Sequence, residues 1–240
     1  MDGSRQVVIF DIGGVIADSP ILAIRRFCQK AGIADVNPFL GRSRAWDAFM
    51  QGKLKPAGFP RAVYEECTEA DYKDGIQLGV QGWMELLESM VSSGYRPLMI
   101  RTLRRLRSTG FKLVALTNNY DTEPLPKAED QARAEAEHQK FMRLFDHFIE
   151  SRVVGLSKPD KRFYEYALKA AGCSAGDAIF LDDIGANLKT AKGMGIRTIL
   201  VRNETDTTFH AAVQELQSLT GVALLDGGHS ARAREQQARL

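Results

Sequence analysis

Residues that could carry out acid, nucleophilic or metal chemistry follow three short apolar runs of this sequence. The runs "VVIF", "LVAL" and "AIFL" each end at carboxylate, hydroxyl or amide side chains, and the segment "GLSKPD" contributes a lysine. Parallel strands of an open sheet bring their carboxyl ends to one edge, so these groups are expected to lie close together. They are Asp11, Thr117, Asn118, Lys158, Asp182 and Asp183.

The types of these residues predict phosphoryl chemistry. Three neighbouring carboxylates repel one another and raise each other's pKa unless a cation neutralises them. Mg²⁺ is the expected cation, because it accepts carboxylates, a backbone carbonyl and waters in an octahedral arrangement. Together with Lys158, a hydroxyl and an amide, the metal would form a cradle for a phosphoryl group around one free carboxylate, which would act as the nucleophile.

The segments that must position these residues alternate between helix and strand after Gly94. Helix-then-strand pairs are predicted in "RPLMIRTLRRLRSTG" and "KLVALTNN", in "KRFYEYALKAAG" and "AIFLDDIGA", and in "NLKTAKGMG" and "RTILVRN". Short unbroken apolar strands that alternate with helices indicate a parallel sheet covered on both faces. The predicted fold class is therefore α/β, with a Rossmann-like, doubly wound parallel sheet.

Residues 19–94 have a different pattern, which is almost entirely helical. Apolar residues recur at spacings of three and four between Gly and Pro breaks in "PILAIRRFCQKAG", "SRAWDAFMQG", "GFPRAVYEECTE" and "GVQGWMELLESMVSSG". This pattern predicts a helical insertion. Residues 119–141 are expected to form a solvated helix, with a surface for a partner as the alternative, and residues 226–240 a mobile tail.

The composition argues against several classes of function. The 32 basic and 30 acidic residues give a formal net charge of +2, so no nucleic-acid partner is indicated. Three widely separated cysteines without metal-ligand spacing indicate reduced thiols in a cytosol-like compartment. No apolar run is long enough to span a membrane and no signal-peptide pattern opens the chain, so a soluble, non-secreted protein is expected. The arginines of "PLMIRTLRRLRSTGFKL" are expected to form a solvated helix face, with a phosphate or partner contact as the alternative.

Five segments match a known family in order and spacing. They are "FDIGGVIADSP", "LVALTNN", "IESRVVGLSKPDKRFYEYAL", "FLDDIGANLKTAKGMGIRTILV" and "VQELQSLTGVALL". Together they resemble the haloacid dehalogenase (HAD) superfamily, and within it the phosphatase-like group related to the N-terminal domain of soluble epoxide hydrolase. The resemblance implies a HAD α/β core at residues 1–18 and 95–225, and a helical cap at residues 19–94.

The resemblance also implies how a metal would be bound. Asp11 would be the nucleophile, forming an aspartyl-phosphate, and would also bind Mg²⁺. Asp183 would be the principal acidic ligand, and Gly13 would contribute its backbone carbonyl. Asp182, which also belongs to the implied metal site, and Asn187 would support the metal waters or the nearby lysine.

The phosphoryl group has its own implied contacts, and one family residue is missing. Thr117 and Asn118 would hydrogen-bond the phosphoryl oxygens, and Lys158 would neutralise them. At the position of Gly13, the family's phosphatases carry an Asp that protonates the leaving alcohol and then activates water. A glycine can do neither, so turnover would be slow, or another acid such as Asp18 or a cap residue would act in its place.

The expected function is therefore a Mg²⁺-dependent HAD-like hydrolase, a phosphatase acting on a small phosphorylated metabolite. The alternative is a catalytically weak or inactive protein that binds a phosphorylated ligand or a partner. A dehalogenase is the third candidate, because a halide leaves without a proton. No G-x-S-x-G nucleophile elbow occurs, so an epoxide-hydrolysing half is not expected. Substrate choice is expected to depend on Arg42, Arg44, Trp46 and Phe49.

The chain ends in a tripeptide that resembles a peroxisomal address. Ala238, Arg239 and Leu240 follow the small–basic–Leu pattern of such C-terminal signals. A random basic end is the alternative. The expected location is cytoplasmic or peroxisomal, and in the second case a peroxisomal import receptor would be a partner.

Overall fold

A five-stranded parallel sheet forms the centre of the computed structural model, which describes residues 6–90, 94–121, 128–202 and 205–225. Its strands are β1 (Val7–Phe10), β2 (Lys112–Thr117), β3 (His147–Glu150), β4 (Ala178–Asp182) and β5 (Arg197–Leu200). The strand order is β3-β2-β1-β4-β5, and all neighbours are parallel. The order changes direction between β1 and β4, which is where ligands bind in doubly wound sheets.

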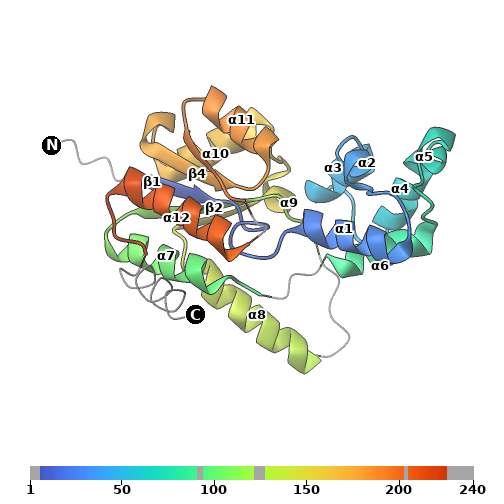
Figure 1. Cartoon of the computed structure of the whole chain (residues 1–240), viewed down its shortest axis with the longest axis horizontal. Helices are drawn as coiled ribbons and strands as arrows, with labels where there is room; N and C mark the ends of the chain where they lie inside the picture. The colour runs from blue at the N-terminus through green and yellow to red at the C-terminus, as the bar shows by residue number, and fades with distance from the viewer. Residues whose placement is uncertain (1–5, 91–93, 122–127, 203–204, 226–240) are drawn as a thin grey trace, which may run out of the picture.

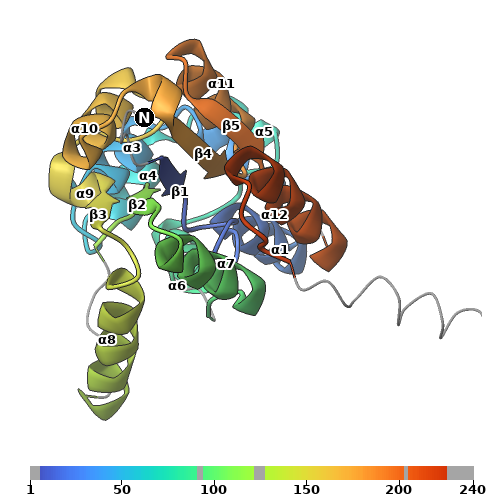
Figure 2. The same cartoon turned by 90° about the vertical axis from the view of Figure 1, so that its left-hand side faces the viewer.

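Helices cover both faces of this sheet (Figure 2). They are α7 (Pro97–Ser108) and α12 (Asp206–Thr220) on one face, and α10 (Lys161–Ala171) and α11 (Gly185–Gly193) on the other. In β1, Val8 and Phe10 pack with α7 and α12, whereas Val7 and Ile9 pack with α10 and α11. Burial on both faces explains the unbroken apolar run of this strand, and the predicted α/β, doubly wound fold is confirmed.

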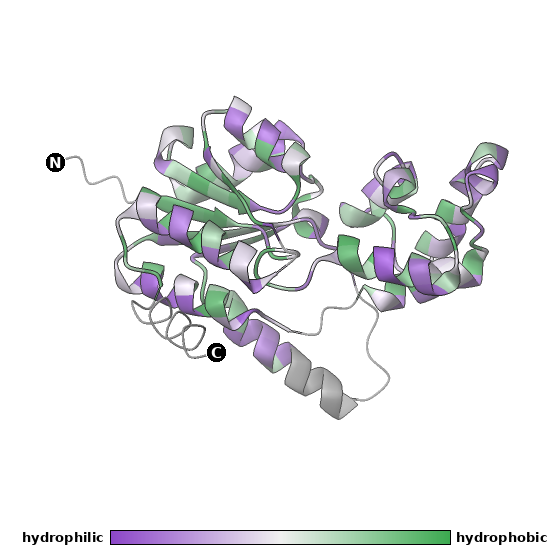
Figure 3. Ribbon diagram, viewed as in Figure 1, coloured by the Kyte–Doolittle hydropathy of each residue, from purple (hydrophilic) through white to green (hydrophobic). Residues whose placement is uncertain are grey.

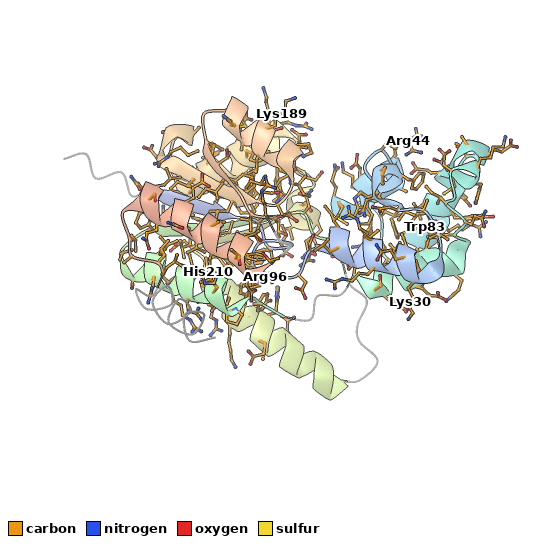
Figure 4. The ribbon with its side chains drawn as sticks, viewed as in Figure 1. Lys30, Arg44, Trp83, Arg96, Lys189 and His210 are labelled. Carbon is orange, nitrogen blue, oxygen red and sulfur yellow. The ribbon has the colours of Figure 1, made fainter. Side chains whose placement is uncertain are left out.

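Six described helices between β1 and α7 form a helical unit beside the carboxyl ends of the strands (Figure 1). They are α1 (Pro20–Ala31), α2 (Asn37–Leu40), α3 (Arg44–Met50), α4 (Phe59–Glu66), α5 (Glu69–Lys73) and α6 (Val80–Ser89). All of these helices except α5 contribute to a hydrophobic cluster of their own, with Trp83 inside it and Arg44 on the surface of the unit (Figure 4). Figure 3 shows apolar residues along the strands and on the inner sides of the helices.

Most of the predicted elements are confirmed, and the missed ones are short or weakly patterned. The helices predicted in residues 19–94 are α1, α3, α4 and α6, whereas α2 and α5 are too short to show a helical period. The sequence also does not predict β3, which has four residues, or α12. The domain boundaries at residues 18 and 94 stay a prediction, and residues 226–240, with the C-terminal tripeptide, lie outside the described part.

Two segments expected to be solvated are partly tied to the α/β unit. α8 (Ala128–Met142) extends away from the sheet (Figure 2), but in its last turn Phe141 is buried and stacks on Tyr95. In α7, Arg105 donates to the carbonyl of Leu224 at 2.7 Å. Arg107 donates at 3.0 Å to the carbonyl of Leu144, which lies between α8 and β3. Among the described helices, none combines the length and the apolar character needed to cross a membrane.

Candidate active site

Strand register places Asp11 between the ends of β2 and β4. Phe10, the last residue of β1, pairs with Ala115 of β2 and with Leu181 of β4. Asp11 comes next and donates its backbone N–H to the carbonyl of Leu181 at 2.9 Å. Because Asp182 follows Leu181, the two carboxylates stand side by side at the carboxyl edge of the sheet, as the sequence predicts.

A buried lysine links these carboxylates. Lys158 Nζ lies 2.8 Å from Asp11 Oδ1 and 2.8 Å from Asp182 Oδ2, and only 1% of the lysine side chain is exposed. Burial opposes the charge of Lys158, but the two carboxylates raise its pKa above the ordinary value. The lysine is therefore held charged beside Asp11, where it could neutralise an incoming anion.

Asp182 is saturated with hydrogen bonds from the protein. Ile184 donates its N–H to Oδ1 at 2.7 Å, and Asn187 Nδ2 lies 3.1 Å from both carboxylate oxygens. Lys158 is a further donor, and Tyr164 donates its hydroxyl to the carbonyl of Asn187 at 3.0 Å. A carboxylate with this many donors is fixed in position and can in turn hold the lysine in place. Asp182 and Asn187 are expected to support either the metal waters or Lys158, and these contacts favour support of Lys158.

Asp183 completes a group of three acids that suits a divalent cation. One carboxylate oxygen from each of Asp11, Asp182 and Asp183 lies within 4.8 Å of the others. Ser19, which no sequence pattern singles out, donates its hydroxyl to Asp183 Oδ2 at 3.1 Å. Burial and the Asp182 charge raise the pKa of Asp183 to about 6. Crowded carboxylate oxygens fit a hard cation such as Mg²⁺, which would replace a proton held by Asp183.

Asn118 holds the lysine segment through its side chain. Its Nδ2 donates to the carbonyl of Lys158 at 2.9 Å, and the N–H of Lys158 donates to Asn118 Oδ1 at 2.8 Å. Thr117 ends β2 and is buried. The amide of Asn118 thus positions Lys158, and the expected contacts of Thr117 and Asn118 with a phosphoryl group stay a prediction.

A side chain at Gly13 would crowd the ring of Pro20. A Cβ atom at this position would lie 2.9 Å from Cδ and 3.3 Å from Cγ of Pro20, the first residue of α1. Asp18, the alternative acid, is half-exposed and pairs with Arg96 at 3.1 Å. The guanidinium of Arg96 itself lies over the ring of Phe209 in α12, 4.1 Å from the ring centroid. Neither position therefore offers an uncommitted proton donor.

The residues expected to govern substrate choice make ion pairs or aromatic contacts within the helical unit. They are Arg42, Arg44, Trp46 and Phe49. The two arginines pair with Asp71 and Glu66. The two aromatic rings pack on Phe59, with centroids 5.8 and 4.5 Å away. Their part in substrate choice stays a prediction.

Mg²⁺ is expected to stabilise the protein more at about pH 8 than at about pH 6. Burial raises the pKa of Asp11 and of Asp183, so the folded, metal-free chain holds protons that the unfolded chain loses near pH 4. Its free energy of unfolding therefore falls as the pH rises through the raised pKa values, and binding of Mg²⁺ would displace the same protons. Melting temperatures with and without Mg²⁺ at both pH values check this, with Asp183→Asn as the control expected to lose the difference. An equal shift at both pH values would contradict it.

A family model described as "haloacid dehalogenase-like hydrolase" matches residues 6–195. The matched region begins at β1 and extends through α11, so it contains every residue of the site described above. The chain belongs to the haloacid dehalogenase-like hydrolase family. The family resemblance seen in the sequence is thereby confirmed.

Relatives of this HAD-like hydrolase include long and short proteins. It is 37% identical over 234 residues to pig bifunctional epoxide hydrolase 2, covering 92% of this chain and 40% of that protein. It is 32% identical over 231 residues to phosphatase MT3486 of Mycobacterium tuberculosis, covering 93% of this chain and 98% of that protein. The chain spans 20–40% of the length of its mouse, rat and pig relatives. A HAD-like family hydrolase from Porphyromonas gingivalis has the same fold, with a TM-score of 0.59, 21% identity and coverage of 88% and 97% of the two chains.

Proposed function

We propose that this protein is a Mg²⁺-dependent phosphatase that acts on a small phosphorylated metabolite. The observation that carries the proposal is the setting of Asp11, which stands at the switch point of the sheet, 2.8 Å from buried Lys158 and close to Asp183. A carboxylate in this place, with a charged lysine and a candidate metal site beside it, is suited to nucleophilic attack on phosphorus. The similarity to phosphatase MT3486 over nearly its full length supports the same class of substrate.

Each residue of the site has a distinct part in this proposal. Asp11 would attack phosphorus while the ester P–O bond breaks and the alcohol or phenol leaves, giving an aspartyl-phosphate. Water would then attack the phosphorus of this intermediate, releasing inorganic phosphate and restoring the Asp11 carboxylate. Lys158, held by Asp182, would stabilise the negative charge that develops on the phosphoryl oxygens. Mg²⁺, bound by Asp11, Asp183 and the carbonyl of Gly13, would supply further positive charge.

Release of phosphate from 4-nitrophenyl phosphate is expected, and it should require Mg²⁺. The rate should fall by about 10²-fold or more for an alkyl phosphate, because Gly13 cannot protonate an alcohol and 4-nitrophenolate leaves without a proton. Phosphate release is measured with Mg²⁺ and with a chelator, and Asp183→Asn serves as the control for metal binding. Full activity in the presence of the chelator would contradict the proposal.

A second candidate function is binding of a phosphorylated ligand without turnover. The closeness of Pro20 to Gly13 favours it, because a carboxylate side chain at position 13 would require Pro20 to shift. In that case inorganic phosphate would bind in the presence of Mg²⁺, yet no phosphate would be released from any ester. Calorimetric titration of phosphate beside the release assay separates the two candidates.

A further inference from the structure

The helical unit contacts the α/β unit directly beside the lysine segment. We call this contact the junction: residues 49–55, which end α3 and continue beyond it, lie against residues 119–121 and 150–157. The second of these segments follows β2, and the third contains α9 (Ser151–Val154), which Figure 1 shows between the two units. Phe49 stacks on Tyr120 with 4.7 Å between ring centroids. The junction thus contains aromatic packing in addition to hydrogen bonds.

Two features bring the backbones at the junction close together. Gly52 has φ +68°, and a Cβ atom there would lie 2.4 Å from the carbonyl oxygen of Arg152. Lys55 Nζ lies 2.6 Å from Asp121, which also pairs with Arg152 at 2.8 Å. Any larger residue at position 52 would therefore push the helical unit away from α9.

Ser151 is the polar centre of the junction. It is fully buried and begins α9. Its hydroxyl donates to the carbonyl of Met50, at the end of α3, and accepts the backbone N–H of Asn119 at 2.9 Å. One side chain therefore joins the helical unit to the loop that follows β2.

Two short routes lead from the junction to Lys158. Asn119 follows Asn118, whose amide bonds both the N–H and the carbonyl of Lys158. Independently, Gln51 Nε2 donates at 3.2 Å to the hydroxyl of Ser157, the residue before Lys158. Displacement of α3 would disturb both attachments of the segment that aims Nζ of Lys158 at Asp11.

We propose that Ser151 is a positioning residue that makes the placement of Lys158 depend on docking of α3 against α9. The inference rests on the proposed function and adds a requirement to it: the phosphate-binding arrangement is complete only while the junction is closed. Ser151 itself does not touch the phosphoryl group. It acts through Asn119 and Asn118.

Removal of the Ser151 hydroxyl should weaken phosphate binding even in the folded protein, in addition to lowering the stability. Ser151→Ala is expected to lower both the affinity for inorganic phosphate with Mg²⁺ and kcat/KM for 4-nitrophenyl phosphate by about tenfold, at temperatures where the variant is folded. The matched control is Thr102→Val, which removes another buried hydroxyl, bonded to Leu98 within α7 at 3.0 Å. The control should lose stability but keep its phosphate affinity and its kcat/KM within about twofold of the wild-type values.

A glycine pair tests the junction without touching Ser151. Gly52→Ala should reproduce the losses of Ser151→Ala by pushing α3 away from α9. Gly32→Ala is its control, because Gly32 has almost the same φ, +69°, but a Cβ atom there would meet no described residue within 4 Å. Both variants place an alanine at nearly the same positive φ, so the contact with Arg152 is the main difference between them.

Hydrogen exchange makes the inference testable apart from the proposed function. The N–H of Lys158, bonded to Asn118, should exchange at least about tenfold faster in Gly52→Ala than in Gly32→Ala. Equal exchange, or phosphate affinity in Gly52→Ala equal to that of its control, would overturn the inference. A wild-type protein that neither binds phosphate nor releases it would overturn the proposed function instead, and the exchange comparison would still decide on the junction.

Discussion

Asparagine in place of Asp11 is expected to abolish phosphate release, lowering kcat by at least about 10³-fold, while the protein stays folded. The amide has the shape of the carboxylate but cannot attack phosphorus. Burial raises the pKa of Asp11, the charges of Asp182 and Asp183 raise it further, and Lys158 opposes them. An uncharged side chain of the same size removes the cost of this ionisation. The melting temperature of the metal-free variant near pH 8 should therefore equal or exceed that of the wild type.

Phosphate release with excess Mg²⁺, beside a thermal melt without metal, measures both parts of this prediction. Asp18→Asn is the matched control, because it makes the same chemical change at a half-exposed carboxylate that pairs with Arg96. It should keep activity within about threefold. A loss as deep as that of Asp11→Asn would instead identify Asp18 as a proton donor. Activity that persists in Asp11→Asn would refute the nucleophile assignment.

Residues at strand ends are the part of the site that the sequence predicts well. Asp11 and Asp182 each end a run of apolar residues, and parallel strands leave such residues at a common edge. The register of β1 and β4 alone places Asp11 next to Asp182. Lys158 belongs to a loop, so the strand order predicts that it can reach this edge but not that its Nζ lies 2.8 Å from both acids.

Contacts between distant segments are the part that the sequence does not reveal. Ser19 donates to Asp183, and Ser151 joins Met50 to Asn119. The sequence around a serine does not indicate which distant residue its hydroxyl will contact. The same limit applies to β3, an edge strand of four residues whose place depends on pairing with β2. Tertiary packing, rather than local preference, determines these features.

A carboxylate at position 13 is expected to raise activity only when Pro20 is replaced as well. Gly13 does not have a positive φ, so a left-handed backbone is not the reason for a glycine there. The obstacle is the ring of Pro20, which would stand 2.9 Å from the new Cβ and cannot rotate aside at the start of α1. Gly13→Asp alone should therefore cost about 1–3 kcal/mol of stability and gain no activity.

Four proteins test this dependence: the wild type, Gly13→Asp, Pro20→Ala and the double variant. Pro20→Ala alone should change little, because the first position of a helix tolerates either residue. The double variant should gain about 10²-fold in kcat/KM, most for alkyl phosphates, because their leaving group needs a proton. A full gain in Gly13→Asp alone would refute the steric argument. A folded, Mg²⁺-binding double variant that stays as slow as the wild type would show that the missing carboxylate does not limit turnover, which would favour the ligand-binding candidate.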